Sequence, residues 1–418
     1  MKTRIIFSIL FLCTISGIKA QDIDYARFLV KNLSSAEMKG RGYVDDGDKN
    51  AARFLASQMS KYELIPLSRK YLQEYEFSIN SFPGKMNVWA GLKKIKPGAD
   101  YLMALSSKGI SSTFAIKRLL NDSLSDSEDF NQLKTQNLSN TIIITDKYHK
   151  NFADTNLLNA AGYVYVKDSS SHLIWKASNG KKLKDYYLLD IRKHIVDSIK
   201  SITLDFENKF LEDHKAYNVA GMVKGSMYPD SFFVFTAHFD HLGMMGEETM
   251  FPGASDNASG TAMMLDLARH FSSPANQPEI SIVFIATSGE EAGLMGAEYF
   301  AEHPLIPLKK IKFLINLDMV GSGSEGITLV NGDQFPKAFQ LMTKINADNE
   351  FIRQVQSRGE SCNSDHCPFY KKGVPAIFIY SRGSESKHYH NIDDTTENLP
   401  LTEYNDIFRL LVQFVKKY

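Results

Sequence analysis

Short apolar runs alternate with helical patterns from residue 216 onward, and this alternation most limits what the chain can fold into. Strands that are nearly continuous in apolar residues are buried on both faces, as in the parallel part of an α/β sheet. Such runs lie at 232–236, 280–286, 311–317 and 376–380. Amphipathic helical patterns lie at 259–271, 291–303, 336–347 and 402–417. The pattern predicts a three-layer α/β/α fold around a central mixed, mostly parallel sheet.

The 418 residues suggest two or three domains. Residues 23–64 have helical spacing of apolar side chains, whereas 85–215 contain Lys and Asp clusters between short β-rich runs such as 141–145 and 163–166. We therefore expect a smaller β-rich domain inserted at 85–215. A set of decorated surface loops is the alternative explanation of this segment.

The first twenty residues have the plan of a secretory signal peptide. Lys2 and Arg4 precede an apolar run at 5–12, and small and polar residues follow up to Ala20. The apolar run is too short to span a bilayer, so we expect cleavage after Ala20 and export to the periplasm or the extracellular space. No later stretch has the roughly 20 apolar residues of a transmembrane helix.

Charge and cysteine content narrow the class of protein further. The chain has 48 Lys and Arg against 48 Asp and Glu, so it has no net charge to attract nucleic acid. After loss of Cys13 with the signal peptide, Cys362 and Cys367 remain. In an exported protein they can form a disulfide or stay as two thiols.

Acidic and imidazole side chains follow each of the four apolar runs, where each predicted strand ends. The carboxyl ends of strands in an open α/β sheet form the ligand crevice. Mixed nitrogen and oxygen ligands suit zinc or a similar divalent ion. The side chains concerned are His238, Asp240, Glu290, Glu291, Asp318, His388 and His390. The sequence therefore predicts a metal site at this edge of the sheet.

Asp256 adds a carboxylate among small residues, at the mouth of the predicted helix at 259–271. The candidate ligands now exceed what one tetrahedral ion needs. One carboxylate shared by two ions about 3.5–4 Å apart would account for the number, and Asp256 is well placed to be that carboxylate.

Five segments in chain order resemble the motifs of the co-catalytic di-zinc aminopeptidases of peptidase family 28, which include bacterial leucyl aminopeptidase-like proteins. They are 236–240 (TAHFD), 255–260 (SDNASG), 289–293 (GEEAG), 316–319 (NLDM) and 389–395 (YHNIDDT). The resemblance implies a zinc peptidase catalytic domain formed by residues 21–84 and 216–418. The segment 85–215 is similar to the protease-associated domain inserted in many relatives.

The resemblance further implies an aminopeptidase that hydrolyses N-terminal residues from peptides with two zinc ions. His238, Asp256 and Asp318 would bind one ion, and Asp256, Glu291 and His390 the other. Glu290 would be the general base for a water bridging the ions, and Asp240 would orient His238.

Two further features follow from the resemblance. Tyr389 would stabilise the tetrahedral oxyanion, with Tyr380 as a second candidate, and the peptide bond between Asp256 and Asn257 would be cis. We expect His241 to lie at the surface or at a helix end.

Three alternative functions stay open. A glutaminyl cyclase-like transferase shares the fold but binds one zinc, whereas His238 and Asp256 together favour two. In a carboxypeptidase or dipeptidase of related fold, a dimerisation domain usually precedes the last histidine, but only 99 residues separate Glu291 from His390 here. A non-catalytic binding protein is expected to lack a ligand or the base, and this sequence has both.

Overall fold

The computed structural model describes residues 22–119, 128–146, 155–385 and 387–418. The predicted signal peptide, residues 1–20, lies outside these described residues. Within the described part of the chain, no helix is long and apolar enough to cross a membrane.

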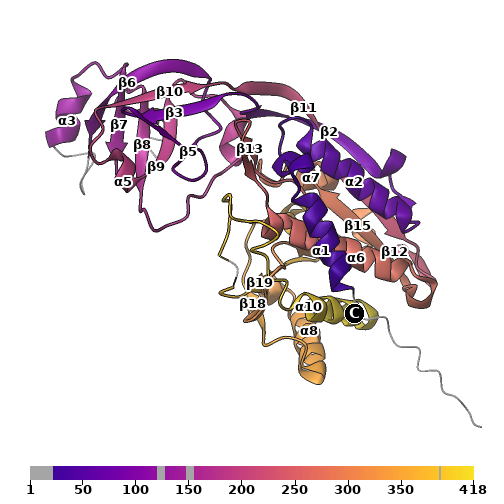
Figure 1. Ribbon diagram of the computed structural model, residues 1–418. Helices are drawn as coiled ribbons and strands as arrows, with labels where there is room; N and C mark the ends of the chain where they lie inside the picture. The colour runs from indigo at the N-terminus through magenta and orange to yellow at the C-terminus, as the bar shows by residue number, and fades with distance from the viewer. Residues whose placement is uncertain (1–21, 120–127, 147–154, 386) are drawn as a thin grey trace, which may run out of the picture.

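A nine-stranded mixed sheet forms the centre of the larger part of the molecule (Figure 1). The strands run in the order β1 (Ile65–Pro66), β11 (Lys209–Val223), β15 (Ile280–Thr287), β12 (Tyr228–His238), β16 (Ile311–Leu317), β19 (Ala376–Arg382), β17 (Gly326–Val330) and β18 (Val355–Arg358), and β2 (Leu72–Ser81) also pairs with β11. The four strands from β15 to β19 are parallel, whereas β11 and β17 are antiparallel to their neighbours β15 and β19. The predicted α/β class and mixed sheet are confirmed, with the parallel pairing concentrated at the centre.

Helices cover both faces of this sheet because successive strand residues point to opposite sides. Phe233 and Phe235 of β12 pack in one cluster with apolar residues of α1, α2, α6, α8 and α10, whereas Val234 packs on the other face with residues of α7 and α9. The helices are α1 (Ile23–Leu33), α2 (Gly47–Lys61), α6 (Gly260–Ser272), α7 (Met295–Glu302), α8 (Pro336–Asn349), α9 (His366–Lys371) and α10 (Tyr404–Lys417). The result is the expected three layers.

Residues 86–206 contribute a second, eight-stranded sheet with a hydrophobic cluster of its own. Its order is β4 (Lys93–Ile95), β3 (Met86–Ala90), β10 (Ser201–Phe206), β6 (Ile110–Arg118), β7 (Thr141–Thr145), β8 (Gly162–Lys167), β9 (Tyr187–Arg192) and β5 (Tyr101–Met103), accompanied by α3 (Glu128–Lys134) and α5 (Lys193–Val196). Figure 1 shows it at the far end of the long pair β2 and β11. We refer to residues 86–206 as the inserted sheet.

One predicted helix begins later than its pattern indicates. The helical spacing starts at Glu291, but α7 begins at Met295, because Gly293 and Leu294 have φ angles of 103° and 61°, in the left-handed region. Glu290 and Glu291 therefore lie in the turn between β15 and α7.

Farther along the chain, Cys362 and Cys367 form a disulfide, with Cα atoms 5.0 Å apart.

Candidate metal centre

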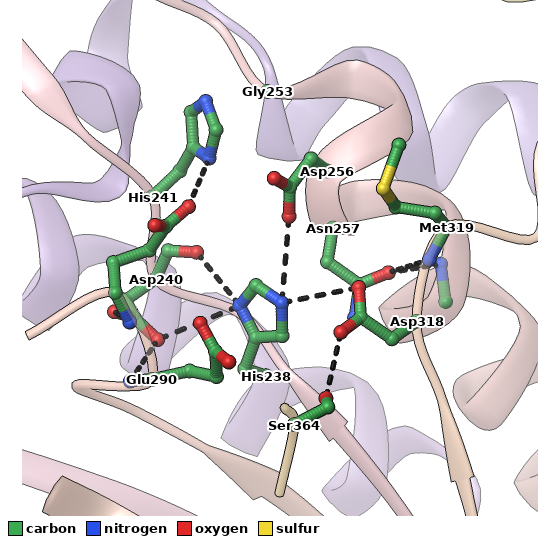
Figure 2. A network of polar contacts seen from close by, with 12 residues as sticks. His238, Asp240, His241, Gly253, Asp256, Asn257, Glu290, Asp318, Met319 and Ser364 are labelled. Carbon is green, nitrogen blue, oxygen red and sulfur yellow. Dashed lines mark hydrogen bonds and ion pairs between the residues drawn. The ribbon is translucent and has the colours of Figure 1, made fainter. Parts of the chain in front are cut away.

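His238 ends the central strand β12 and lies at the middle of a buried polar cluster (Figure 2). Its Nε2 atom is 3.4 Å from Asp256 Oδ1 and 3.3 Å from Asp318 Oδ1. Asp318 follows directly after β16, the strand that pairs with β12. Register between parallel strands thus brings together two side chains that are 80 residues apart in the sequence.

Asp256 lies in the turn η4 (Ala254–Ser259) that leads into α6, and its peptide bond to Asn257 is cis, as the family resemblance implies. Its Oδ2 atom is 2.9 Å from His390 Nε2, while its Oδ1 atom faces His238. The two oxygens of one carboxylate therefore face two different imidazoles. The backbone N–H groups of Ser255 and Asp256 donate to the buried carboxylate of Asp394, which holds the turn in place.

The carboxylate of Asp240 binds the backbone of both adjacent glutamates. Its carboxylate oxygens accept hydrogen bonds from the backbone N–H groups of Glu290 and Glu291, at 3.1 and 3.2 Å. His238 Nδ1 lies 3.2 Å from the carbonyl oxygen of Asp240 and 3.7 Å from its carboxylate. Asp240 thus contacts the histidine mainly through its backbone carbonyl oxygen, and its carboxylate fixes the turn that carries both glutamates.

Glu291 turns toward the second imidazole, with Oε1 3.2 Å from His390 Nε2. The remaining nitrogen of His390, Nδ1, lies 2.9 Å from the carbonyl oxygen of Trp175 in the inserted sheet. This contact fits a ring that donates through Nδ1 and keeps Nε2 as a ligand atom.

The expectation that His241 lies at the surface is wrong. His241 is fully buried, and its Nδ1 atom is 2.9 Å from Glu291 Oε1. Ligand atoms of His241, Asp256 and Glu291 lie within 4.8 Å of one another, as do those of His238, Asp256 and Asp318. The signal that could have found it is its position: it is the second histidine of the same strand-end loop, one residue after Asp240.

The two glutamates have opposite pKa shifts. Burial would raise the pKa of Glu291, but His390 and His241 outweigh it and hold that pKa well below its usual range. Burial raises the pKa of Glu290 well above its usual range, despite the opposing effect of His238. Neighbouring acids whose pKa values are pushed apart are suited to different roles, one as a charged ligand and the other as a proton carrier.

Two further residues complete the surroundings. Ser364, which was not singled out as a ligand, donates a hydrogen bond of 2.7 Å to Asp318 Oδ2 and accepts one from Asn316. Tyr389 is 44% exposed and stacks on the His390 ring, with centroids 3.8 Å apart. Tyr389 therefore lies on the solvent side of the second imidazole.

The residues present fit a pair of divalent ions. Asp240, Asp256, Glu291 and Asp318 are buried with His238, His241 and His390, and Glu290 is partly buried beside them. His241 Nε2 is buried and has no hydrogen-bond partner among the described residues. Such an excess of buried carboxylates is costly unless cations compensate it, and the donor set is the nitrogen and oxygen mixture that zinc accepts.

The α/β/α fold places a buried cluster of imidazoles and carboxylates at the ends of its central strands. This arrangement is typical of a metal-binding protein. The model of peptidase family M28 matches residues 218–415 of this chain. The fold is also that of BSAP, a zinc aminopeptidase from Bacillus subtilis, with a TM-score of 0.70, 19% identity and coverage of 95% of each chain.

Two of the relatives that match the sequence show the extent of the similarity. A probable zinc metalloprotease of Leptosphaeria maculans is 27% identical over 275 residues, which cover 56% of this chain and 62% of the relative. Aminopeptidase YwaD of Bacillus subtilis is 28% identical over 233 residues, covering 53% of this chain and 46% of the relative. The matched part of the chain thus spans about half the length of these relatives.

Proposed function

We propose that this protein is a zinc-dependent aminopeptidase that hydrolyses N-terminal residues from peptides. The observation that carries the proposal is the position of Asp256, whose two carboxylate oxygens face His238 and His390 at 3.4 and 2.9 Å. A carboxylate shared in this way suits two ions about 3.5–4 Å apart. The names of the relatives, zinc metalloprotease and aminopeptidase, support the same activity.

Each ion would have three protein ligands. His238, Asp256 and Asp318 would hold one, and Asp256, Glu291 and His390 the other, with His241 beside Glu291. When bound, zinc polarises a carbonyl group and lowers the pKa of a coordinated water toward neutrality.

The chain's own residues would move the protons and orient the substrate. Glu290, held by its backbone N–H on Asp240, would accept a proton from the attacking water at its carboxylate and return it to the leaving amine. The hydroxyl group of Tyr389 would donate a hydrogen bond to the oxyanion as the tetrahedral intermediate forms. Tyr380 is the second candidate for that role.

The function is tested with leucine, alanine and lysine anilides as substrates, with zinc and then with a chelator. We expect hydrolysis that the chelator abolishes. Glu290→Gln should lower kcat by about 10²–10⁴-fold and leave the zinc content unchanged, because it removes only the proton acceptor. Glu298→Gln, an exposed glutamate of α7, is the matched control and should keep full activity.

Other results would favour the alternatives. One zinc per chain, together with cyclisation of peptides that begin with glutamine, would favour the glutaminyl cyclase-like transferase. Release of C-terminal residues, or cleavage confined to dipeptides, would favour a carboxypeptidase or dipeptidase. No chelator-sensitive turnover of anilides or of blocked and free peptides would favour a binding protein.

We also infer that the protein is exported to the periplasm or the extracellular space. The signal-like residues 1–20 support this location. The disulfide between Cys362 and Cys367 supports it too, because disulfides persist mainly in oxidising compartments.

A further inference from the structure

A second group of metal-binding side chains lies outside the candidate metal centre, where the inserted sheet meets the loop after β19. Ligand atoms of His172, His388 and Asp393 lie within 4.8 Å of one another. His172 Nδ1 is 3.7 Å from Asp393 Oδ2, and the rings of His172 and His388 meet edge to face with centroids 5.3 Å apart. His172 follows β8 in the inserted sheet, whereas His388 and Asp393 flank His390.

We propose that His172, His388 and Asp393 form a separate site for zinc or a similar divalent cation, which fastens the inserted sheet to the loop that carries His390. Two imidazoles and one carboxylate form a common set of zinc ligands. Tetrahedral ligands at about 2.1 Å from zinc are separated by about 3.4 Å. The His172–Asp393 pair, which is half-exposed, therefore needs to close by only a few tenths of an ångström.

A second observation points to a missing partner at this position. His388 Nδ1 is buried and has no hydrogen-bond partner among the described residues. A buried polar atom without a partner is costly, and a bound ion is one of its ordinary explanations. Metal coordination would satisfy this nitrogen, and the neighbouring ligands would come from both parts of the molecule.

A simple surface ion pair explains less. The side chains of His172 and Asp393 are 46% and 52% exposed, and an ion pair this open to solvent contributes little to stability. It would leave the buried nitrogen of His388 unpaired. The ion-pair explanation therefore accounts for two of the three side chains.

The location gives the site a structural role. The backbone N–H of Trp175 donates to the carbonyl oxygen of His390 at 2.9 Å, and His390 Nδ1 lies 2.9 Å from the carbonyl oxygen of Trp175. Trp175 is three residues after His172, and His390 is two residues after His388. An ion at the proposed site would hold the same junction that orients His390.

The test compares the zinc content of full-length variants after equilibrium dialysis at fixed concentrations of free zinc. We expect His172→Ala and Asp393→Asn each to bind one ion fewer than the wild type. His194→Ala removes another exposed histidine of the inserted sheet and should bind as many ions as the wild type. Equal zinc content in wild type and His172→Ala, at free zinc up to about 100 μM, would overturn the site.

This test does not depend on the proposed peptidase activity, because it measures a difference of one ion and no turnover. Asp256→Asn alters the candidate metal centre and leaves His172, His388 and Asp393 intact. This variant should therefore still bind the ion at the proposed second site. If Asp256→Asn and the double variant Asp256→Asn/His172→Ala retain the same zinc, the proposed site does not exist.

Discussion

At the scale of single residues, the candidate metal centre depends on how each carboxylate is restrained. Asp240 accepts hydrogen bonds from the backbone of Glu290 and Glu291, and the hydroxyl group of Tyr43 lies 3.2 Å from its Oδ2. Asp318 is held by Ser364. Oriented ligands of this kind lose little conformational freedom when they bind an ion.

His241 is predicted to strengthen binding of the ion that we propose at Glu291. His241→Ala removes the contact of 2.9 Å with Glu291 Oε1. The affinity for the zinc ion proposed at Glu291 should therefore fall about 10–100-fold. Zinc titration should show a normal affinity for the ion held by His238 and Asp318. His303→Ala, at an exposed histidine, is the control, and equal affinities in both variants would show that His241 has no such role.

The sequence predicts the types of the site residues better than their surroundings. Four of the predicted ligands end or follow buried strands, and this placement indicates that they converge: His238, Glu291, Asp318 and His390. Asp256 instead precedes a helix. His241 lies in the same strand-end loop as Asp240, but a histidine in a loop is exposed in most contexts, so this position alone does not predict its burial. Only the turn that returns it against Glu291 distinguishes it.

At the scale of elements, a buried arginine joins the segments on which the candidate metal centre is built. Arg41, at the end of η1 (Ala36–Arg41), is completely buried and donates hydrogen bonds to the carbonyl groups of Leu33, Phe239, Pro252, Gly253 and Asp256. Burial lowers the pKa of Arg41 to about 10, so it stays charged at neutral pH. The N-terminal helices are thereby bound to the loops of His238 and Asp256.

Arg41→Met should lower the free energy of unfolding by about 3 kcal/mol or more, because several buried carbonyl groups lose their donor. Chemical denaturation monitored by circular dichroism measures this change. Arg53→Met, at an exposed position of α2, should change it by less than about 0.5 kcal/mol. A loss of less than 1 kcal/mol in Arg41→Met would contradict the role of this arginine.

Helices and strands could be predicted from the sequence where the side chains that pack in the core also form a recognisable local pattern. The strands at 311–317 and 141–145 have the predicted bounds because both are short runs dominated by apolar residues. The long strand β11 carries charged residues along its first half and was not predicted. Its pairing with the equally mixed strand β2 stabilises it, and that partner lies more than 100 residues away in the sequence.

At the scale of the whole molecule, the inserted sheet supplies part of the candidate metal centre. The Trp175 indole N–H donates to the carbonyl oxygen of Met103, and its ring lies 4.7 Å from that of Phe251. This packing fixes the backbone carbonyl group that faces His390 Nδ1, 215 residues away in the sequence. A contact of such separation leaves no local pattern, so no sequence feature could predict it.

Trp175→Ala should therefore weaken binding of the ion that we propose at Asp256, Glu291 and His390 by about 10–100-fold. Binding of the ion proposed at His238 and Asp318 should weaken less. Zinc retention during dialysis against a weak chelator measures the difference. Trp89→Ala, at the partly exposed tryptophan of β3, is the matched control and should retain both ions. Identical retention in the two tryptophan variants would show that the inserted sheet does not orient His390.

The most direct test of the central claim is anomalous X-ray scattering at the zinc edge from crystals of the zinc-loaded protein. We predict two peaks about 3.5–4 Å apart with the Asp256 carboxylate between them, one beside His238 and Asp318 and the other beside Glu291 and His390. A single peak in this cluster, or peaks that Asp256 does not contact, would contradict the two-ion centre.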